Sequence, residues 1–156
     1  MSFPDRLLER IRKSGFLDPT PIQSAAIPQI LNGRDVIGIA QTGSGKTAGF
    51  VWPIILHCTK QAPLKHGDGP MGLIMAPTRE LCQQLYQEVR KFAKNFSSVR
   101  VGIVFGGGNM FDQGKELKKG VEILIATPGR LIGSGFNYSL IVSHTNSSRS
   151  LYTSPY

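Results

Sequence analysis

Residues 35–47 read DVIGIAQTGSGKT, a short apolar run followed by a glycine-rich turn. The turn, Ala40–Thr47, fits the phosphate-loop pattern G-x-x-x-x-G-K-[ST] at every defined position but the first, where Ala40 stands. We predict that Asp35–Ala40 is a buried strand and that a helix runs from Lys46 to about Cys58, kinked at Pro53. A strand that leads through such a turn into a helix is the unit of phosphate-binding α/β domains.

The residue types of this turn suit a bound triphosphate. Gly43 and Gly45 allow the backbone to wrap closely, so that successive amide groups face the phosphates. Lys46 would neutralise the β- and γ-phosphates, and the Thr47 hydroxyl would ligate Mg²⁺. Glycine beside lysine also occurs in unrelated turns, but the placement between a strand and a helix indicates a nucleotide site.

The rest of the chain repeats the alternation of short apolar runs and helical patterns. Further helices are expected at 5–14, from the turn at 18–23 to about 31, and at 78–94 and 111–119. Further strands are expected at 71–76, 99–105 and 121–126. This order predicts right-handed crossovers and a three-layer α/β fold, with a mainly parallel sheet covered on both faces.

Composition limits the class of protein. With 156 residues and 40% hydrophobic residues, the chain can form one domain with a core. Its net charge of +8 favours an anionic partner such as nucleic acid, although solubility alone would give the same balance. We expect no signal peptide and no membrane span, and we interpret Cys58 and Cys82 as buried, reduced thiols of an intracellular protein.

A polar residue upstream of the turn suggests which base the nucleotide carries. Gln23 lies at the end of a proline-stiffened turn, and Phe16 lies seven residues earlier. A primary amide can pair with the N6 and N7 edge of adenine, and an aromatic ring can stack on the base. Taken alone, the two residues are more often a turn amide and a core ring; beside a phosphate loop they favour adenine.

Five motifs together resemble the DEAD-box RNA helicase family. They are GFLDPTPIQ (15–23), AQTGSGKT (40–47), APTREL (76–81), Gly106-Gly107 and ATPGR (126–130), in the family's order. The resemblance runs from about Phe3 to Ile132 and is to the first RecA-like domain, a P-loop NTPase fold; Ala40 is also what the family carries. Segments 67–70, 82–92 and 106–113 are most similar to the branch associated with nuclear pre-mRNA splicing.

The resemblance implies a role for each matching residue. Phe16 and Gln23 would hold the adenine of ATP. The triphosphate and its Mg²⁺ would be held by Thr42, Gly43, Ser44, Gly45, Lys46 and Thr47, of which Lys46 and Thr47 are the catalytic candidates. RNA would lie along Thr78, Arg79, Gly106, Gly107, Thr127, Gly129 and Arg130. Alternatives stay open, since PTRE is also typical of a helix N-cap and TPGR of a strand-to-helix turn.

The resemblance ends after Ile132. The family continues to Asp-Glu-Ala-Asp, to Ser-Ala-Thr and to a second domain, none of which occurs here. We therefore expect residues 1–132 to form a partial ATP-binding domain with a sheet incomplete on its C-terminal side, and residues 133–156 to be a poorly ordered tail. Without the neighbouring strands, Asp35–Ala40 would keep an unpaired apolar edge.

Three hypotheses about activity follow. The first is an ATP-dependent RNA helicase by family, nuclear and associated with splicing proteins, whose isolated chain lacks hydrolase activity. The second is a non-catalytic fragment that binds nucleotide and RNA without hydrolysis. The third is a different phosphate-loop enzyme such as a small-molecule kinase, against which Gln23 and PTREL argue.

Overall fold

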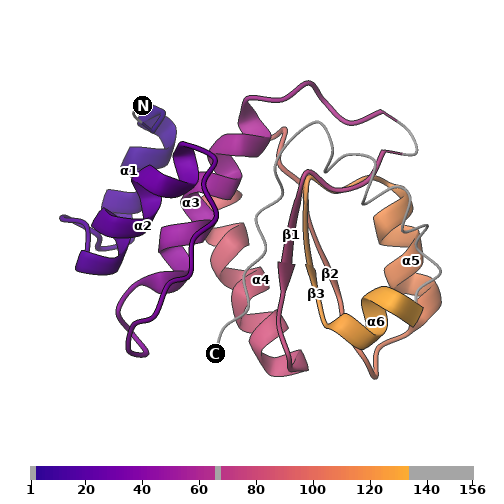
Figure 1. Ribbon diagram of the computed structural model, residues 1–156. Helices are drawn as coiled ribbons and strands as arrows, with labels where there is room; N and C mark the ends of the chain where they lie inside the picture. The colour runs from indigo at the N-terminus through magenta and orange to yellow at the C-terminus, as the bar shows by residue number, and fades with distance from the viewer. Residues whose placement is uncertain (1–2, 66–67, 134–156) are drawn as a thin grey trace.

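The computed structural model describes residues 3–65 and 68–133 (Figure 1). Its helices are α1 (Asp5–Lys13), α2 (Pro21–Leu31), α3 (Lys46–Thr59), α4 (Arg79–Ala93), α5 (Met110–Lys118) and α6 (Pro128–Gly133). Its strands are β1 (Gly72–Met75), β2 (Val101–Val104) and β3 (Ile123–Ala126). The tail predicted for 133–156 lies outside the described residues, apart from Gly133 at the end of α6.

The three strands form one parallel sheet in the order β1-β3-β2. Their carboxyl ends are level, because Met75 and Val104 both pair with Ala126. Each strand is followed by a helix, as a parallel sheet requires. The predicted α/β class and parallel sheet are confirmed.

Alternation along the central strand divides the core into two layers. Ile123 and Ile125 belong to the larger apolar cluster, which also contains buried residues of α1, α3 and α4. Leu124 and Ala126 belong to a second cluster, with Leu117 of α5. Figure 1 accordingly shows α4 on one side of the sheet and α5 and α6 on the other. All four residues of β3 are buried, so the sheet is covered on both faces, as predicted.

The prediction that Asp35–Ala40 forms a buried strand is wrong for the described structure. The segment has no regular secondary structure, and Ile37 and Ile39 are 92% and 87% exposed. Figure 1 shows it as a bare loop beside α3. The physical reason is pairing: a short apolar run becomes a strand only beside a partner, and none of the three described strands pairs with it.

The helices agree more closely with the sequence. Helix α3 begins at Lys46, as predicted, and continues as one element through Pro53 to Thr59. Cys58 and Cys82 are free and buried, as expected, and burial raises the pKa of their thiols to about 12 and about 11. Among the described residues, no helix combines the length and apolar character needed to cross a membrane.

Candidate functional site

The turn before α3 has the backbone that a phosphate loop needs. Gly43 and Gly45 have φ values of 80° and 87°, in the left-handed region, and Gly45 is the N-cap of α3. Only glycine adopts this region without strain, which is the physical reason for both glycines. Because α3 starts at Lys46, its unpaired N–H groups and its positive dipole end lie at this turn.

The Lys46 side chain lies against the turn. Its Nζ donates to the carbonyl oxygen of Ala40 and, at 3.2 Å, to that of Gln41. These bonds hold a cation next to the amino end of a helix, where two sources of positive potential add together. Such an arrangement suits an anionic ligand.

Gln23 braces the turn from α2. Its side chain is fully buried, its Nε2 donates to the Gly45 carbonyl oxygen at 3.1 Å, and its Oε1 accepts from the Thr20 N–H at 3.1 Å. A Cβ atom at Gly45 would lie 2.5 Å from this Nε2. The amide thus joins the start of α2 to the phosphate loop, while the adenine contact expected of it stays a prediction.

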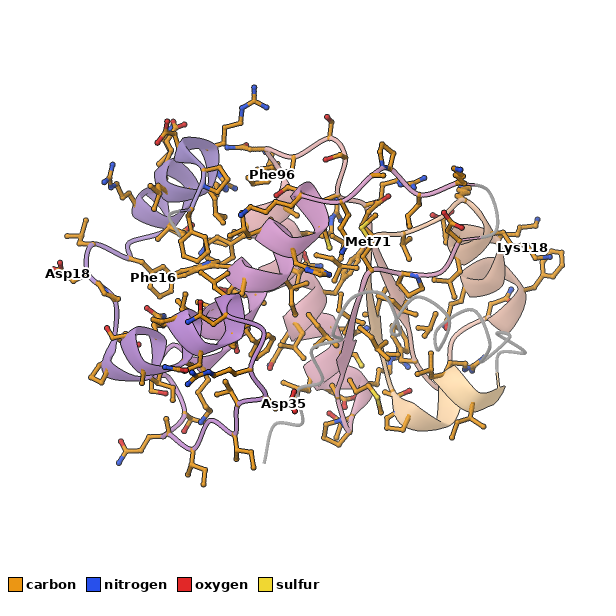
Figure 2. All side chains as sticks on the ribbon, turned by 45° about the horizontal axis from the view of Figure 1, so that its top comes forward. Phe16, Asp18, Asp35, Met71, Phe96 and Lys118 are labelled. Carbon is orange, nitrogen blue, oxygen red and sulfur yellow. The ribbon has the colours of Figure 1, made fainter. Side chains whose placement is uncertain are left out.

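Phe16 packs in an aromatic cluster between the N-terminal helices and α3. Figure 2 labels Phe16 beside the N-terminal helices. Its ring centroid lies 5.2 Å from that of Trp52, edge to face, and 6.2 Å from that of Phe92. The side chain is half-buried. This packing agrees with the alternative of a core ring, and the adenine-stacking role stays a prediction.

The second set of candidate residues gathers at the edge of the sheet where the carboxyl ends of the three strands lie, here called the sheet edge. Thr78 follows β1, Gly106 and Gly107 follow β2, and Thr127 follows β3. The strand ends are tied together, since the Ala76 N–H donates to the Ala126 carbonyl and the Thr127 N–H to the Val104 carbonyl, both at 3.0 Å. The topology therefore brings together three motifs that are far apart in the sequence.

Two arginines at this edge contact the loop after β2. The Arg79 guanidinium carbon lies 4.9 Å from the Phe105 ring centroid, and Arg130 Nη2 donates to the Gly108 carbonyl at 3.1 Å. Thr78 caps α4, its Oγ1 accepting from the Leu81 N–H at 3.2 Å. The N-cap alternative for PTRE is thus confirmed. The capping bond of Thr78 does not involve Arg79, which is exposed at the first position of the helix and can contact an external phosphate.

Sequence reasoning missed two residues of this edge, Phe105 and Gln113. The Gln113 side chain hydrogen-bonds both the N–H and the carbonyl of Phe105. A glutamine in the first turns of a helix is typical of any solvent-facing helix, so the sequence offered no specific signal for this contact.

An ion pair joins the strands at the opposite end of the sheet. Glu122 is 3% exposed and accepts from the Arg100 backbone N–H (2.6 Å), Nε (3.1 Å) and Nη2 (2.8 Å). Burial alone would raise the pKa of Glu122, but these hydrogen bonds and the Arg100 charge outweigh it and hold the pKa below its usual value. We assign this pair a structural role, because it links the starts of β2 and β3.

Comparison with known proteins gives a consistent result. The model of the DEAD/DEAH box helicase family matches residues 20–149. The ATP-dependent RNA helicase DDX42 of Homo sapiens is 52% identical over 130 residues, which cover 83% of this chain but only 14% of that protein.

Two solved structures are also similar. The RNA helicase Prp28 of Chaetomium thermophilum bound to ADP superposes with a TM-score of 0.77 and 37% identity, over 97% of this chain and 43% of that one. The yeast DEAD-box splicing factor Prp28 gives a TM-score of 0.77 and 41% identity, over 85% and 32%.

Proposed function

This chain belongs to the DEAD/DEAH box helicase family, and from that premise we propose that it carries the ATP-binding and RNA-contacting motifs of an ATP-dependent RNA helicase. One observation carries the nucleotide half of the proposal. A turn with two left-handed glycines enters α3 while the buried Gln23 amide fixes its last carbonyl. A turn of this kind, which enters a helix beside a lysine, provides the free helix N–H groups and the positive charge that a triphosphate requires.

We assign Mg²⁺ to the Thr47 hydroxyl. Thr47 is half-buried at the start of α3, next to Lys46. Few protein ligands are needed, because Mg²⁺ keeps waters and takes phosphate oxygens. The Ser44 hydroxyl oxygen is buried in the same turn without a hydrogen-bond partner among the described residues, so a polar ligand at the turn would satisfy it. When bound, the ion would neutralise charge on the phosphates.

The RNA half rests on the edge formed by the strand ends. Its groups are hydroxyls, backbone amides and arginines, which grip phosphate and sugar without reading bases. The residues we assign to the RNA backbone are Thr78, Arg79, Gly106, Gly107, Thr127, Gly129 and Arg130. Binding should weaken as salt rises, because phosphate contacts release counterions.

A second candidate function is nucleotide and RNA binding without hydrolysis. The observation that favours it is that the groups assigned to the two sites, among the residues that the structure describes, are binding groups: hydroxyls, backbone N–H groups and cations. We therefore expect RNA-stimulated phosphate release no greater than that of the Lys46→Ala variant. Phosphate release clearly above that level would show that this chain hydrolyses ATP, and it would contradict this second candidate.

The nucleotide site is tested with two lysines of one helix. Lys46→Ala removes the cation at the start of α3, and Lys60→Ala, just beyond the other end of the helix, is the matched control. Titration with fluorescent ADP should show that Lys46→Ala weakens binding by at least about tenfold, since a phosphate–lysine contact is charge-assisted, while Lys60→Ala binds as the wild type does. Equal affinities for all three proteins would contradict the site.

We further propose a nuclear location and contact with splicing proteins. The support is similarity to Prp28, which in yeast is described as a splicing factor. Fluorescence microscopy of the tagged chain tests the location, and exclusion of the tag from nuclei would contradict it.

A further inference from the structure

The end of β2 presents two backbone groups on the open side of the sheet. The Val104 carbonyl accepts from the Thr127 N–H on the β3 side. Backbone groups of successive strand residues point to opposite sides, so the N–H and carbonyl of Phe105 face away from β3. In the described sheet β2 is an edge strand, and no other strand supplies partners on that side.

Gln113 of α5 supplies both partners. The Phe105 N–H donates to Gln113 Oε1 at 3.2 Å, and Gln113 Nε2 donates to the Phe105 carbonyl at 3.3 Å. A primary amide carries the same donor and acceptor as a peptide group, so it extends the hydrogen-bond ladder by one residue. Gly108 makes room for this contact, because a Cβ atom there would collide with the Gln113 amide nitrogen.

The loop held in this way contacts both arginines of the edge. The Phe105 ring lies against the Arg79 guanidinium, with 4.9 Å between the guanidinium carbon and the ring centroid. The Gly108 carbonyl, three residues further on, accepts from Arg130 at 3.1 Å. A movement of this loop would therefore disturb contacts of two cations on different helices, Arg79 on α4 and Arg130 on α6.

We propose that Gln113 is a positioning residue for RNA binding: it fixes the loop Phe105–Gly108 so that Arg79 and Arg130 are held ready for adjacent phosphates of one strand. This inference rests on the RNA half of the proposed function. Its physical basis is preorganisation, since donors already held in place lose less conformational freedom when the strand binds. Gln113 itself makes no contact with RNA in this proposal.

The test uses the full chain and two substitutions at one position. Gln113→Ala removes the side chain, and Gln113→Met keeps its length and volume but neither hydrogen bond. Gln87→Ala, an exposed glutamine on α4, is the matched control. A fluorescein-labelled single-stranded RNA is titrated by anisotropy, fluorescent ADP is titrated in parallel, and thermal unfolding confirms that each variant is folded.

Both substitutions at Gln113 should weaken RNA binding by about fivefold to tenfold, less than the loss of a whole charge-assisted contact because both arginines remain, and leave ADP affinity unchanged. In the Arg79→Ala background, Gln113→Ala should cost less than it does alone but should keep part of its effect, because the loop still supports Arg130. A purely structural role would weaken both ligands together.

The other outcomes separate the two proposals. If the wild type fails to bind RNA at low salt, both the RNA half of the proposed function and this inference are wrong. If the wild type binds and the Gln113 variants bind equally well, the inference alone is overturned. If Gln113→Met binds like the wild type while Gln113→Ala does not, volume and not hydrogen bonding matters, and the inference is again overturned.

Discussion

The two candidate sites rest on different kinds of support. The edge with the RNA-type residues lies at the ends of three paired strands, and the central strand is buried along its whole length. The phosphate loop follows a segment with no strand, in which Ile37 and Ile39 are almost fully exposed. One site is held by the sheet, and the other by contacts close to the loop itself.

The contacts that hold the phosphate loop can be named individually. Gln23 binds the Gly45 carbonyl, Lys46 binds carbonyls of the same turn, and two glycines permit its backbone angles. A site of this kind keeps its shape through a few local interactions, so single substitutions should alter it without unfolding the domain. The sheet edge should behave in the opposite way, because its shape depends on the global fold.

The largest expected difference in the free energy of unfolding is between substitutions of two isoleucines. Ile125 is fully buried in β3 and Ile37 is 92% exposed. Ile125→Ala should reduce the free energy of unfolding by about 2–5 kcal/mol through lost burial and a cavity. Ile37→Ala should change it by no more than about 0.5 kcal/mol. Urea unfolding followed by circular dichroism measures both, and a comparable loss for Ile37→Ala would mean that Asp35–Ala40 is packed as a strand in solution.

The sequence predicted the sheet better than the segment before the loop, for a physical reason. The runs at 71–76, 99–105 and 121–126 all contain observed strands, because in each case another run of the same kind was available as a partner. DVIGIA is a similar short apolar run, but none of the described strands pairs with it. Local pattern indicates which residues can form a strand, whereas pairing decides whether they do.

The same limit applies to side chains. The close turn of the backbone at Gly43 and Gly45 was predictable, because it depends on backbone angles within one turn. The contact between Gln113 and Phe105 was not, since it depends on where α5 packs against the end of β2. The fully buried Gln23 was identified as important, but its bond to Gly45 required the packing of α2 on α3.

The second prediction concerns the pH dependence of stability. It uses Glu122, which lies at the opposite end of the sheet from the residues assigned to RNA. Because the folded-state pKa of Glu122 is lowered, its contribution to stability is present above its usual pKa near 4.5 and is lost as pH falls through the lowered value. Glu122→Gln should cost about 2 kcal/mol at pH 7, the scale of a hydrogen bond to a charged group, and less in acid.

Unfolding curves between pH 7 and pH 3 measure this difference. The control is Glu9→Gln, which removes an exposed ion pair with Lys13 and should have little effect at any pH. A difference between the wild type and Glu122→Gln that does not shrink in acid would show that Glu122 is not ionised in the folded protein.

The third prediction compares the two glycines of the phosphate loop. Both have positive φ, so alanine at either position is strained by about 1–2 kcal/mol. A Cβ atom at Gly45 would also meet Gln23 at 2.5 Å, whereas a Cβ atom at Gly43 meets nothing within 4 Å. Gly45→Ala should therefore destabilise more than Gly43→Ala and should weaken ADP binding more. Equal effects would show that Gln23 does not brace the loop.

The smallest expected effect on stability tests whether the phosphate loop is shaped for a ligand. The Ser44 hydroxyl oxygen is buried and has no hydrogen-bond partner among the described residues. Ser44→Ala removes no hydrogen bond seen among the described residues, so the free energy of unfolding should change by less than about 0.5 kcal/mol, and any change should be an increase, because an unsatisfied buried hydroxyl is lost. If the hydroxyl serves bound phosphate, the same substitution should weaken ADP binding by about threefold to tenfold, the value of one hydrogen bond. Thermal unfolding and ADP titration on the same samples separate the two quantities. A loss of stability without a loss of affinity would mean that the Ser44 hydroxyl supports the fold and not the ligand.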